Sequence, residues 1–167
     1  MKTLFLLRHA KSSWNQAGLT DRQRPLNRRG RRDAPEMGRR LARRDIGPDL
    51  IVSSPAERAL TTAKIVAEQL GRDPARVLID TDIYAASVPD LLQVIRDFDP
   101  SHACILLVGH NPALTDTVNH LTGSVIPNVP TCGLAEIEMA EDAWASAGEN
   151  SARLVNFDYP KNTPEAD

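Results

Sequence analysis

The amino-acid sequence predicts an α/β fold, a three-layer sandwich in which helices cover both faces of a mostly parallel central sheet. Short apolar runs, each long enough for one strand, alternate along the chain with segments of helical spacing. The run at 103–108 is the most apolar in the chain, which is typical of a central strand covered on both sides. A length of 167 residues suits one domain, and we predict a single domain over residues 1–167.

Glycine, proline and periodicity place the elements of the first half of the chain. Apolar side chains recur at helical spacing after Gly30, and Gly47-Pro48 ends that helix. Ser54-Pro55 begins a second helix, because proline is tolerated in a first turn. In chain order we predict a strand at 3–7, a polar loop at 15–29, a helix at 30–44, a strand at 49–52 and a helix at 54–70.

The second half continues the alternation and then changes. After Gly123 the helical spacing is lost, and residues 134–139 alternate apolar with polar side chains, as an antiparallel or edge strand does. We expect about the last ten residues to be frayed. In chain order we predict a strand at 77–79, a helix at 88–98, a strand at 103–108, a helix at 111–121 and strands at 134–139 and 153–157.

Composition excludes several classes of protein. No segment approaches the roughly 18 apolar residues that a membrane span requires, so we expect no membrane association. The two cysteines, Cys104 and Cys132, cannot build a disulfide framework, and no Cys or His cluster has the spacing of a zinc site. The apolar run at the N-terminus is too short for a signal peptide. We therefore expect a cytoplasmic protein without a metal or cofactor.

A net charge of −2 conceals a strong asymmetry along the chain. Residues 1–44 hold 13 Lys or Arg and three acidic residues, whereas the remainder is strongly acidic. The basic segment at 28–44 has two interpretations, a docking surface for an acidic partner or the solvated face of a helix. The acidic remainder and an aromatic content of 4% argue against a nucleic-acid binder.

Cations and imidazoles follow three of the predicted strands. Arg8 and His9 come directly after the first strand, Arg58 lies just beyond the second, and His110 follows the strand at 103–108. Because the carboxyl ends of parallel strands meet at one edge of a sheet, we expect these four side chains to converge. Two guanidinium groups and two imidazoles near helix N-termini form a site for a phosphoryl group. Any one of them alone is typical of an ordinary surface residue.

Other phosphate chemistries lack their residues in this chain. No glycine-rich nucleotide loop ending in Lys-Ser/Thr occurs, and neither cysteine is followed by an arginine at the spacing of a cysteine phosphatase. Aspartate nucleophile motifs and carboxylate–histidine sets with metal spacing are also missing. Histidine is therefore the best nucleophile that the sequence offers.

Three motifs together resemble the histidine phosphatase (phosphoglycerate mutase-like) superfamily. Residues 7–15 resemble its Arg-His-Gly signature, with Ala10 replacing the usual glycine; residues 53–63 resemble the second motif, and residues 109–111 the third. Arg-Pro-Leu at 24–26 and the short length are similar to the bacterial phosphohistidine phosphatase (SixA-type) branch. The matches lie in the expected order over about two thirds of the chain.

The resemblance implies a metal-free phosphoryl transfer in two steps. His9 would attack phosphorus and become phosphorylated, and water would then release phosphate. Arg8, Arg58 and His110 would hold the non-bridging oxygens, and a backbone carbonyl would fix the tautomer of His9. We expect further substrate contacts from Ser12, Asn15, Arg24 and Asn111.

The general acid departs from the superfamily pattern. Larger members carry a glutamate after the third strand, whereas the corresponding stretch here offers Asp82, whose role as an acid or as a loop cap stays open. A missing acid and a missing lid favour phosphohistidine on a protein, for example a histidine phosphotransfer domain, because imidazole is a good leaving group. Two alternatives remain, a phosphomonoesterase for a small metabolite that uses Asp82 and a phospho-ligand binding module without turnover.

Overall fold

The computed structural model describes residues 1–163 and contains one six-stranded sheet with strand order β3-β2-β4-β1-β5-β6. The first four strands in the chain run parallel, and β5 is antiparallel to both of its neighbours. The predicted α/β fold with a mostly parallel sheet is confirmed. The strands are β1 (Thr3–Arg8), β2 (Leu50–Ser53), β3 (Leu78–Ile79), β4 (Cys104–Gly109), β5 (Leu134–Met139) and β6 (Ala152–Asp158).

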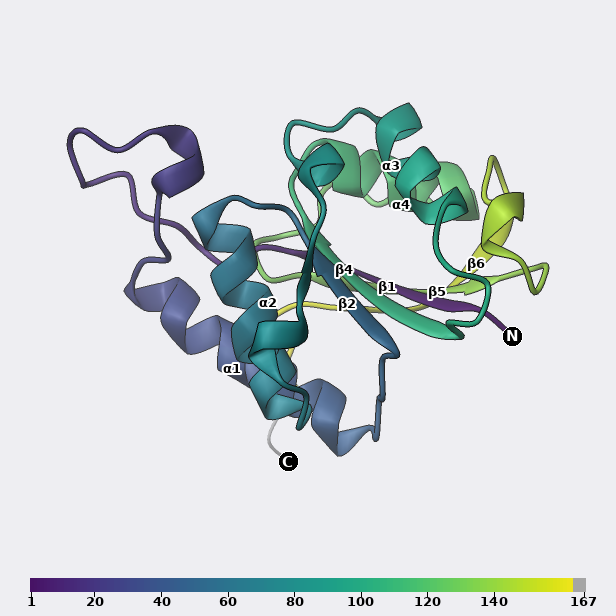
Figure 1. Cartoon of the computed structure of the whole chain (residues 1–167), viewed down its shortest axis with the longest axis horizontal. Helices are drawn as coiled ribbons and strands as arrows, with labels where there is room; N and C mark the ends of the chain where they lie inside the picture. Colours follow the sequence, from purple (N-terminus) through teal and green to yellow (C-terminus); the bar gives the residue numbers. More distant parts are fainter. Residues whose placement is uncertain (164–167) are drawn as a thin grey trace.

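Helices cover the sheet in two layers (Figure 1). The pair α1 and α2 packs on one face, and the pair α3 and α4 packs on the other. Among the residues that the structure describes, no helix is long and apolar enough to cross a membrane. The helices are α1 (Arg28–Arg43), α2 (Glu57–Gln69), α3 (Val88–Arg96) and α4 (Ala113–Thr122), with 3-10 turns η1 (Asp21–Gln23), η2 (Pro74–Arg76), η3 (Thr81–Ile83) and η4 (Trp144–Ser146).

The strand β1 shows how alternation builds two cores. Leu4 and Leu6 point into the cluster beneath α3 and α4, whereas Phe5 and Leu7 point into the cluster beneath α1 and α2. All four side chains are buried, and each fully buried side chain of this size contributes about 1.5–3 kcal/mol. β4 is buried in the same way on both faces and lies between β1 and β2, as its apolar sequence predicts.

The strands after the parallel part also match their predictions, with one refinement. The alternating segment at 134–139 is an antiparallel strand, but it lies inside the sheet because β6 pairs with its outer side and forms the edge. Most predicted boundaries shift by one to three residues, and the loop predicted at 15–29 contains the short turn η1 and the start of α1.

The predicted frayed end needs a partial correction. Arg40 of α1 donates hydrogen bonds to the Asp158 carboxylate and to the carbonyl oxygens of Tyr159 and Pro160. These residues are therefore fastened to α1. The rest of that prediction falls on residues 164–167, which lie outside the described part of the chain.

Gly30 allows α1 to approach the backbone that follows β1. A Cβ built on Gly30 would overlap the carbonyl oxygen of Lys11. That same oxygen accepts a hydrogen bond from the backbone N–H of Asn27, whose side chain caps α1 by accepting from the N–H of Gly30. The first turn of α1 and the segment after β1 are thus locked together.

We expect Gly30→Ala to lower the free energy of unfolding by about 1–3 kcal/mol, because the methyl group displaces backbone rather than a flexible side chain. Urea unfolding followed by circular dichroism measures this change. Gly148→Ala is the matched control, since the nearest atom to its added methyl group lies 3.8 Å away. Equal stability of the two variants would contradict the close approach.

Candidate active site

A pocket of about 160 Å³ lies at the carboxyl ends of β1 and β4. The register pairs Arg8 with Gly109, so the residues that follow, His9 and His110, emerge side by side. Four of the lining residues are Lys or Arg, and none of the lining residues described is a carboxylate, so the pocket attracts anions. Its lining residues are Arg8, His9, Lys11, Ser12, Trp14, Arg24, Arg58, His110, Asn111 and Thr131.

The imidazole of His9 is held in one tautomer. Its Nδ1 lies 2.7 Å from the carbonyl oxygen of Ala10, and since a carbonyl only accepts, Nδ1 carries the proton and donates it. The other nitrogen, Nε2, therefore keeps its lone pair. Burial, together with the nearby charges of His110, Arg58 and Arg8, lowers the pKa of His9 to about 3. His9 is thus a neutral imidazole that can act as a nucleophile at pH 7.

Ala10 and Thr62 fix the backbone beneath His9. The N–H of Ala10 donates to Oγ1 of Thr62 at 3.0 Å, and Thr62 in turn donates to the carbonyl oxygen of Arg58. The methyl group of Ala10 is buried in the core beneath α1 and α2 and does not line the pocket. Alanine in place of the usual glycine therefore leaves the pocket surface unchanged.

His110 is oriented by a serine at the end of the neighbouring strand. Its Nε2 lies 2.7 Å from Oγ of Ser54, and its ring centroid lies 5.2 Å from that of His9. Burial lowers the pKa of His110 to about 4, with Arg58 and Arg8 contributing. Nδ1 of His110 is buried without a hydrogen-bond partner. If Ser54 donates to Nε2, then Nδ1 carries a proton that a ligand oxygen can accept.

Arg8 has a second unsatisfied donor in the same place. One of its terminal nitrogens donates to the carbonyl oxygen of Val129 at 3.1 Å, whereas Nε is buried without a partner. An unsatisfied buried polar group costs about 1–3 kcal/mol. Arg8 and His110, which both line the pocket, thus each carry one buried nitrogen without a partner in residues 1–163.

Arg58 is engaged by an aspartate from the loop after β1. Its guanidinium donates to the carbonyl oxygen and to a carboxylate oxygen of Asp21, at 2.7 and 3.1 Å. The same carboxylate accepts hydrogen bonds from Tyr84 at 2.5 Å and from Arg24 at 3.0 Å. These donors, with Tyr84 first, hold the pKa of Asp21 well below its usual range. Asp21 is therefore an ionised counter-charge for Arg58 and not a proton donor.

Two of the predicted secondary contacts, Ser12 and Arg24, line the pocket. Arg24 reaches back from its loop and donates to Oγ of Ser12 at 2.5 Å, while its guanidinium lies 3.2 Å from the ring centroid of Trp14. The hydroxyl proton of Ser12 stays free to donate elsewhere. Both side chains therefore lie where an oxyanion would bind, and their contact with a substrate stays a prediction.

Three other predicted site residues are placed differently. Asn111 lines the pocket, but its side-chain amide is already bonded to Thr115, Asn128 and Val129. Its geometry suits support of the loop whose Val129 carbonyl holds Arg8, and not a direct phosphate contact. Asn15 is exposed and does not line the pocket. Asp82 lies in a separate groove, so the structure does not bring this candidate acid to His9.

Sequence reasoning missed three residues around the pocket. Asp21 binds Arg58, Ser54 orients His110, and the Tyr84 ring lies edge-on to His110 with centroids 5.7 Å apart. Ser54 could have been predicted from the sequence, because it directly follows strand β2, which ends at the edge of the sheet where the site lies. Asp21 and Tyr84 lie in loops, and no local pattern predicts their contacts.

Comparisons with known proteins show to which family the chain belongs. An uncharacterized chloroplastic protein of Arabidopsis thaliana is 31% identical over 154 residues, which span 87% of this chain and 70% of the relative. The model of the histidine phosphatase superfamily, branch 1, matches residues 4–83, including His9 and Arg58. The chain belongs to the histidine phosphatase superfamily. The resemblance inferred from the three motifs is thereby confirmed.

Solved structures of similar fold include members of this superfamily. A structure assigned as the phosphohistidine phosphatase SixA of Agrobacterium tumefaciens has a TM-score of 0.79 and 28% identity, over 95% of this chain and 98% of that one. A protein histidine phosphatase SixA complexed with tungstate shares the fold, with a TM-score of 0.81 and 20% identity, over 95% and 97% of the two chains. The chain is thus a phosphatase by its family, and its fold is similar to that of the SixA structures.

No group of three His, Cys, Asp or Glu side chains in residues 1–163 is arranged to hold a metal ion. Cys104 and Cys132 are both free thiols, and burial raises the pKa of Cys104 to about 11. Neither cysteine lines the pocket of this histidine phosphatase.

We expect His9 and His110 of the histidine phosphatase to stay neutral down to about pH 5, because their pKa values are lowered to about 3 and about 4. The unfolded chain binds protons at both imidazoles below its ordinary pKa of 6.5, so stability falls as the pH drops from there toward 4. Imidazole carbon shifts of labelled protein measure both titrations, with His9→Ala and His110→Gln for assignment. A midpoint near 6.5 for either residue would contradict this expectation.

We expect Asp21→Asn to tighten binding of inorganic phosphate about three- to tenfold, because it removes the carboxylate that occupies Arg58 and Arg24. Titration calorimetry measures the dissociation constant. Asp116→Asn, at an exposed position of α4, is the control and leaves it unchanged. Weaker phosphate binding would mean that Asp21 chiefly orients the arginines rather than competing for them.

Proposed function

We propose that this phosphatase hydrolyses phosphohistidine on a protein partner, without a metal ion, through a phosphorylated His9. The observation that carries the proposal is the neutral His9, whose free Nε2 accompanies two unsatisfied buried donors at an anion-attracting pocket. A nucleophile and preorganised donors for a phosphoryl group are the two requirements of this chemistry.

In the first step, Nε2 of His9 attacks phosphorus in line with the leaving group. A P–N bond forms to His9 as the P–N bond to the substrate imidazole breaks, and the leaving imidazole retains a proton. Nδ1 of His9 keeps its proton and donates to the Ala10 carbonyl, which stabilises the positive charge that develops on the ring. Arg8, Arg58 and His110 would hold the non-bridging oxygens.

In the second step, water attacks phosphorus of phosphorylated His9. The P–N bond breaks, inorganic phosphate forms and the neutral imidazole is restored. The hydrogen bond between Ser54 and His110 and the one from the backbone N–H of Ala10 to Thr62 keep both rings in place throughout. Arg8, Arg58 and His110 would thus hold the phosphoryl oxygens in the transition states of both steps.

The lack of a carboxylic acid among the described lining residues of the pocket favours phosphohistidine over an ester as the substrate. An alkoxide leaving group needs a proton donor, but the described lining residues include no carboxyl group, and Asp21 nearby is held ionised. The pKa of Tyr84 is raised by its hydrogen bond to Asp21, so its proton is held more tightly. A protonated imidazole leaves without such a donor. Asp82, the candidate acid of the metabolite phosphomonoesterase, lines a separate groove and not this pocket, which weighs against that alternative.

Pocket size points in the same direction. A volume of about 160 Å³ is well below the roughly 300–1,000 Å³ of typical small-molecule sites, so it suits a phosphoryl group with little else. The rest of the substrate then lies on the surrounding surface, as a protein does.

The basic helix α1 offers less free charge to a partner than its sequence indicates. Glu36 pairs with three of its arginines, Asp33 with two, and Arg44 just beyond the helix pairs with Glu136. Of the pocket cations, Arg8 and Lys11 take part in no salt bridge within residues 1–163, so they stay available to an acidic partner.

The test is a paired assay of wild type and His9→Ala, with EDTA present. The substrates are a histidine phosphotransfer domain phosphorylated on histidine and an aryl phosphate. We expect wild type to dephosphorylate the protein and His9→Ala to lower kcat/KM by at least about a thousandfold, because the nucleophile is lost. His120→Ala, which changes a histidine of α4, is the matched control and retains activity.

Turnover of the aryl phosphate alone would replace the proposal with the phosphomonoesterase. Loss of activity in EDTA that added metal restores would refute metal independence. Folded protein that binds phosphate, turns over neither substrate and forms no phosphorylated His9 would be a binding module.

A further inference from the structure

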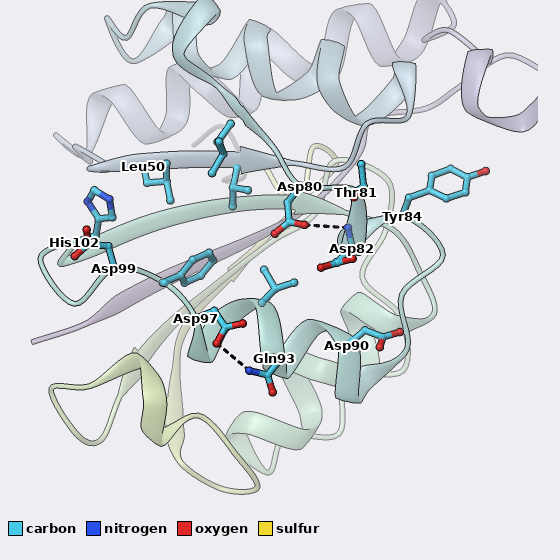
Figure 2. A pocket seen from close by; sticks show the side chains of 14 residues that line it. Leu50, Asp80, Thr81, Asp82, Tyr84, Asp90, Gln93, Asp97, Asp99 and His102 are labelled. Carbon is cyan, nitrogen blue, oxygen red and sulfur yellow. Dashed lines mark hydrogen bonds between the residues drawn. The ribbon is translucent and has the colours of Figure 1, made fainter.

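A second and larger hollow lies beside the active site. This acidic groove, of about 580 Å³, runs between the edge of the sheet at β2 and β3 and the helix α3 (Figure 2). Apolar side chains form part of its lining, and Tyr84 and His102 mark its two ends. The apolar members are Leu50, Val52, Leu78, Val94 and Phe98.

Five carboxylates line the groove, and no Lys or Arg is among its lining residues. Within residues 1–163 none of the five takes part in a salt bridge, in contrast to the carboxylates that face α1. Backbone hydrogen bonds lower the pKa values of Asp90 and Asp99, so both stay ionised at neutral pH. The groove therefore carries an excess of negative charge, with His102 and Lys2 near Asp99 at one end. The five residues are Asp80, Asp82, Asp90, Asp97 and Asp99.

Tyr84 connects this groove to the phosphoryl pocket. Its side chain lines the groove, its ring contacts His110, and its hydroxyl donates to the Asp21 carboxylate that binds Arg58. A chain segment that lies in the groove thus reaches the pocket without leaving the surface. The charge changes sign at Tyr84, from carboxylates in the groove to cations in the pocket.

We propose that the acidic groove binds a lysine- or arginine-bearing extended segment of the protein substrate, next to its phosphohistidine. Long basic side chains match both features of the groove, since their aliphatic stems cover apolar surface while their charged ends reach carboxylates. A purely apolar segment leaves the five carboxylates unpaired, and an acidic segment is repelled by them. This inference rests on the proposed function, because it concerns how the same substrate is held.

The test compares two synthetic peptides that carry phosphohistidine followed by a run of lysines or a run of glutamates. We expect wild type to show a higher kcat/KM for the lysine peptide and to lose this preference at high salt, because the contacts are electrostatic. The variant Asp90→Asn/Asp97→Asn keeps the hydrogen-bonding shape of both side chains and removes two charges. We expect it to reduce the preference about three- to tenfold.

Two controls separate docking from general effects. Glu68→Gln/Asp116→Asn removes two exposed carboxylates outside the groove and keeps the lysine preference. Free phosphohistidine, which is too small to reach the groove, is turned over equally by all three proteins. Wild type that shows no preference, or prefers glutamate, overturns the inference, and so does a preference that the groove variant retains in full.

Failure of the proposed function gives a different result. In that case wild type hydrolyses neither peptide and not free phosphohistidine either. Calorimetry with the unphosphorylated lysine peptide then tests whether the groove binds a basic segment, independently of any hydrolysis. Binding that Asp90→Asn/Asp97→Asn weakens supports the docking surface, and lack of binding to wild type overturns it.

Discussion

The site depends on the parallel pairing of β1 with β4 and on the register that sets Arg8 level with Gly109. Both strands end at this level, and the next residue of each is a histidine. The sheet, rather than a loop, therefore sets the 5.2 Å between the two ring centroids. Sheet geometry is the least deformable part of an α/β protein, because each strand is fixed by backbone hydrogen bonds and by burial on both faces. Strand β1 also supplies Arg8 and helix α2 supplies Arg58, so of the pocket arginines only Arg24 comes from a loop.

Burial and charge act together on the imidazoles. Desolvation and nearby guanidinium groups both disfavour the protonated form, so His9 stays neutral although it lies beside cations. The negative charge of a phosphoryl group offsets the cations around the pocket, so the site can bind it while His9 remains neutral. The pocket is thus suited to an anionic ligand, which competes with Asp21 for Arg58.

The sequence predicted the framework of the site and less of its surroundings. His9 and His110 directly follow strands, and the rule that parallel strand ends share an edge was enough to bring them together. Asp82 follows a strand of only two residues, and the turn η3 directs it into the acidic groove, which no local pattern encodes. Asn111 has a suitable position, but its hydrogen bonds are taken by residues after α4. Asp21 meets Arg58 only through tertiary contacts of its loop.

The pairing of Asp21 with Arg58 also bears on how the protein reaches its native state. Gathering four cations around one pocket is unfavourable in a chain that is still folding, and an acid from within the chain relieves that repulsion. The charge of Arg58 is thus offset in the native structure without an anion from solution. The same carboxylate is also held by Tyr84 and Arg24, so an anion that binds Arg58 competes with an acid fixed in place by three partners.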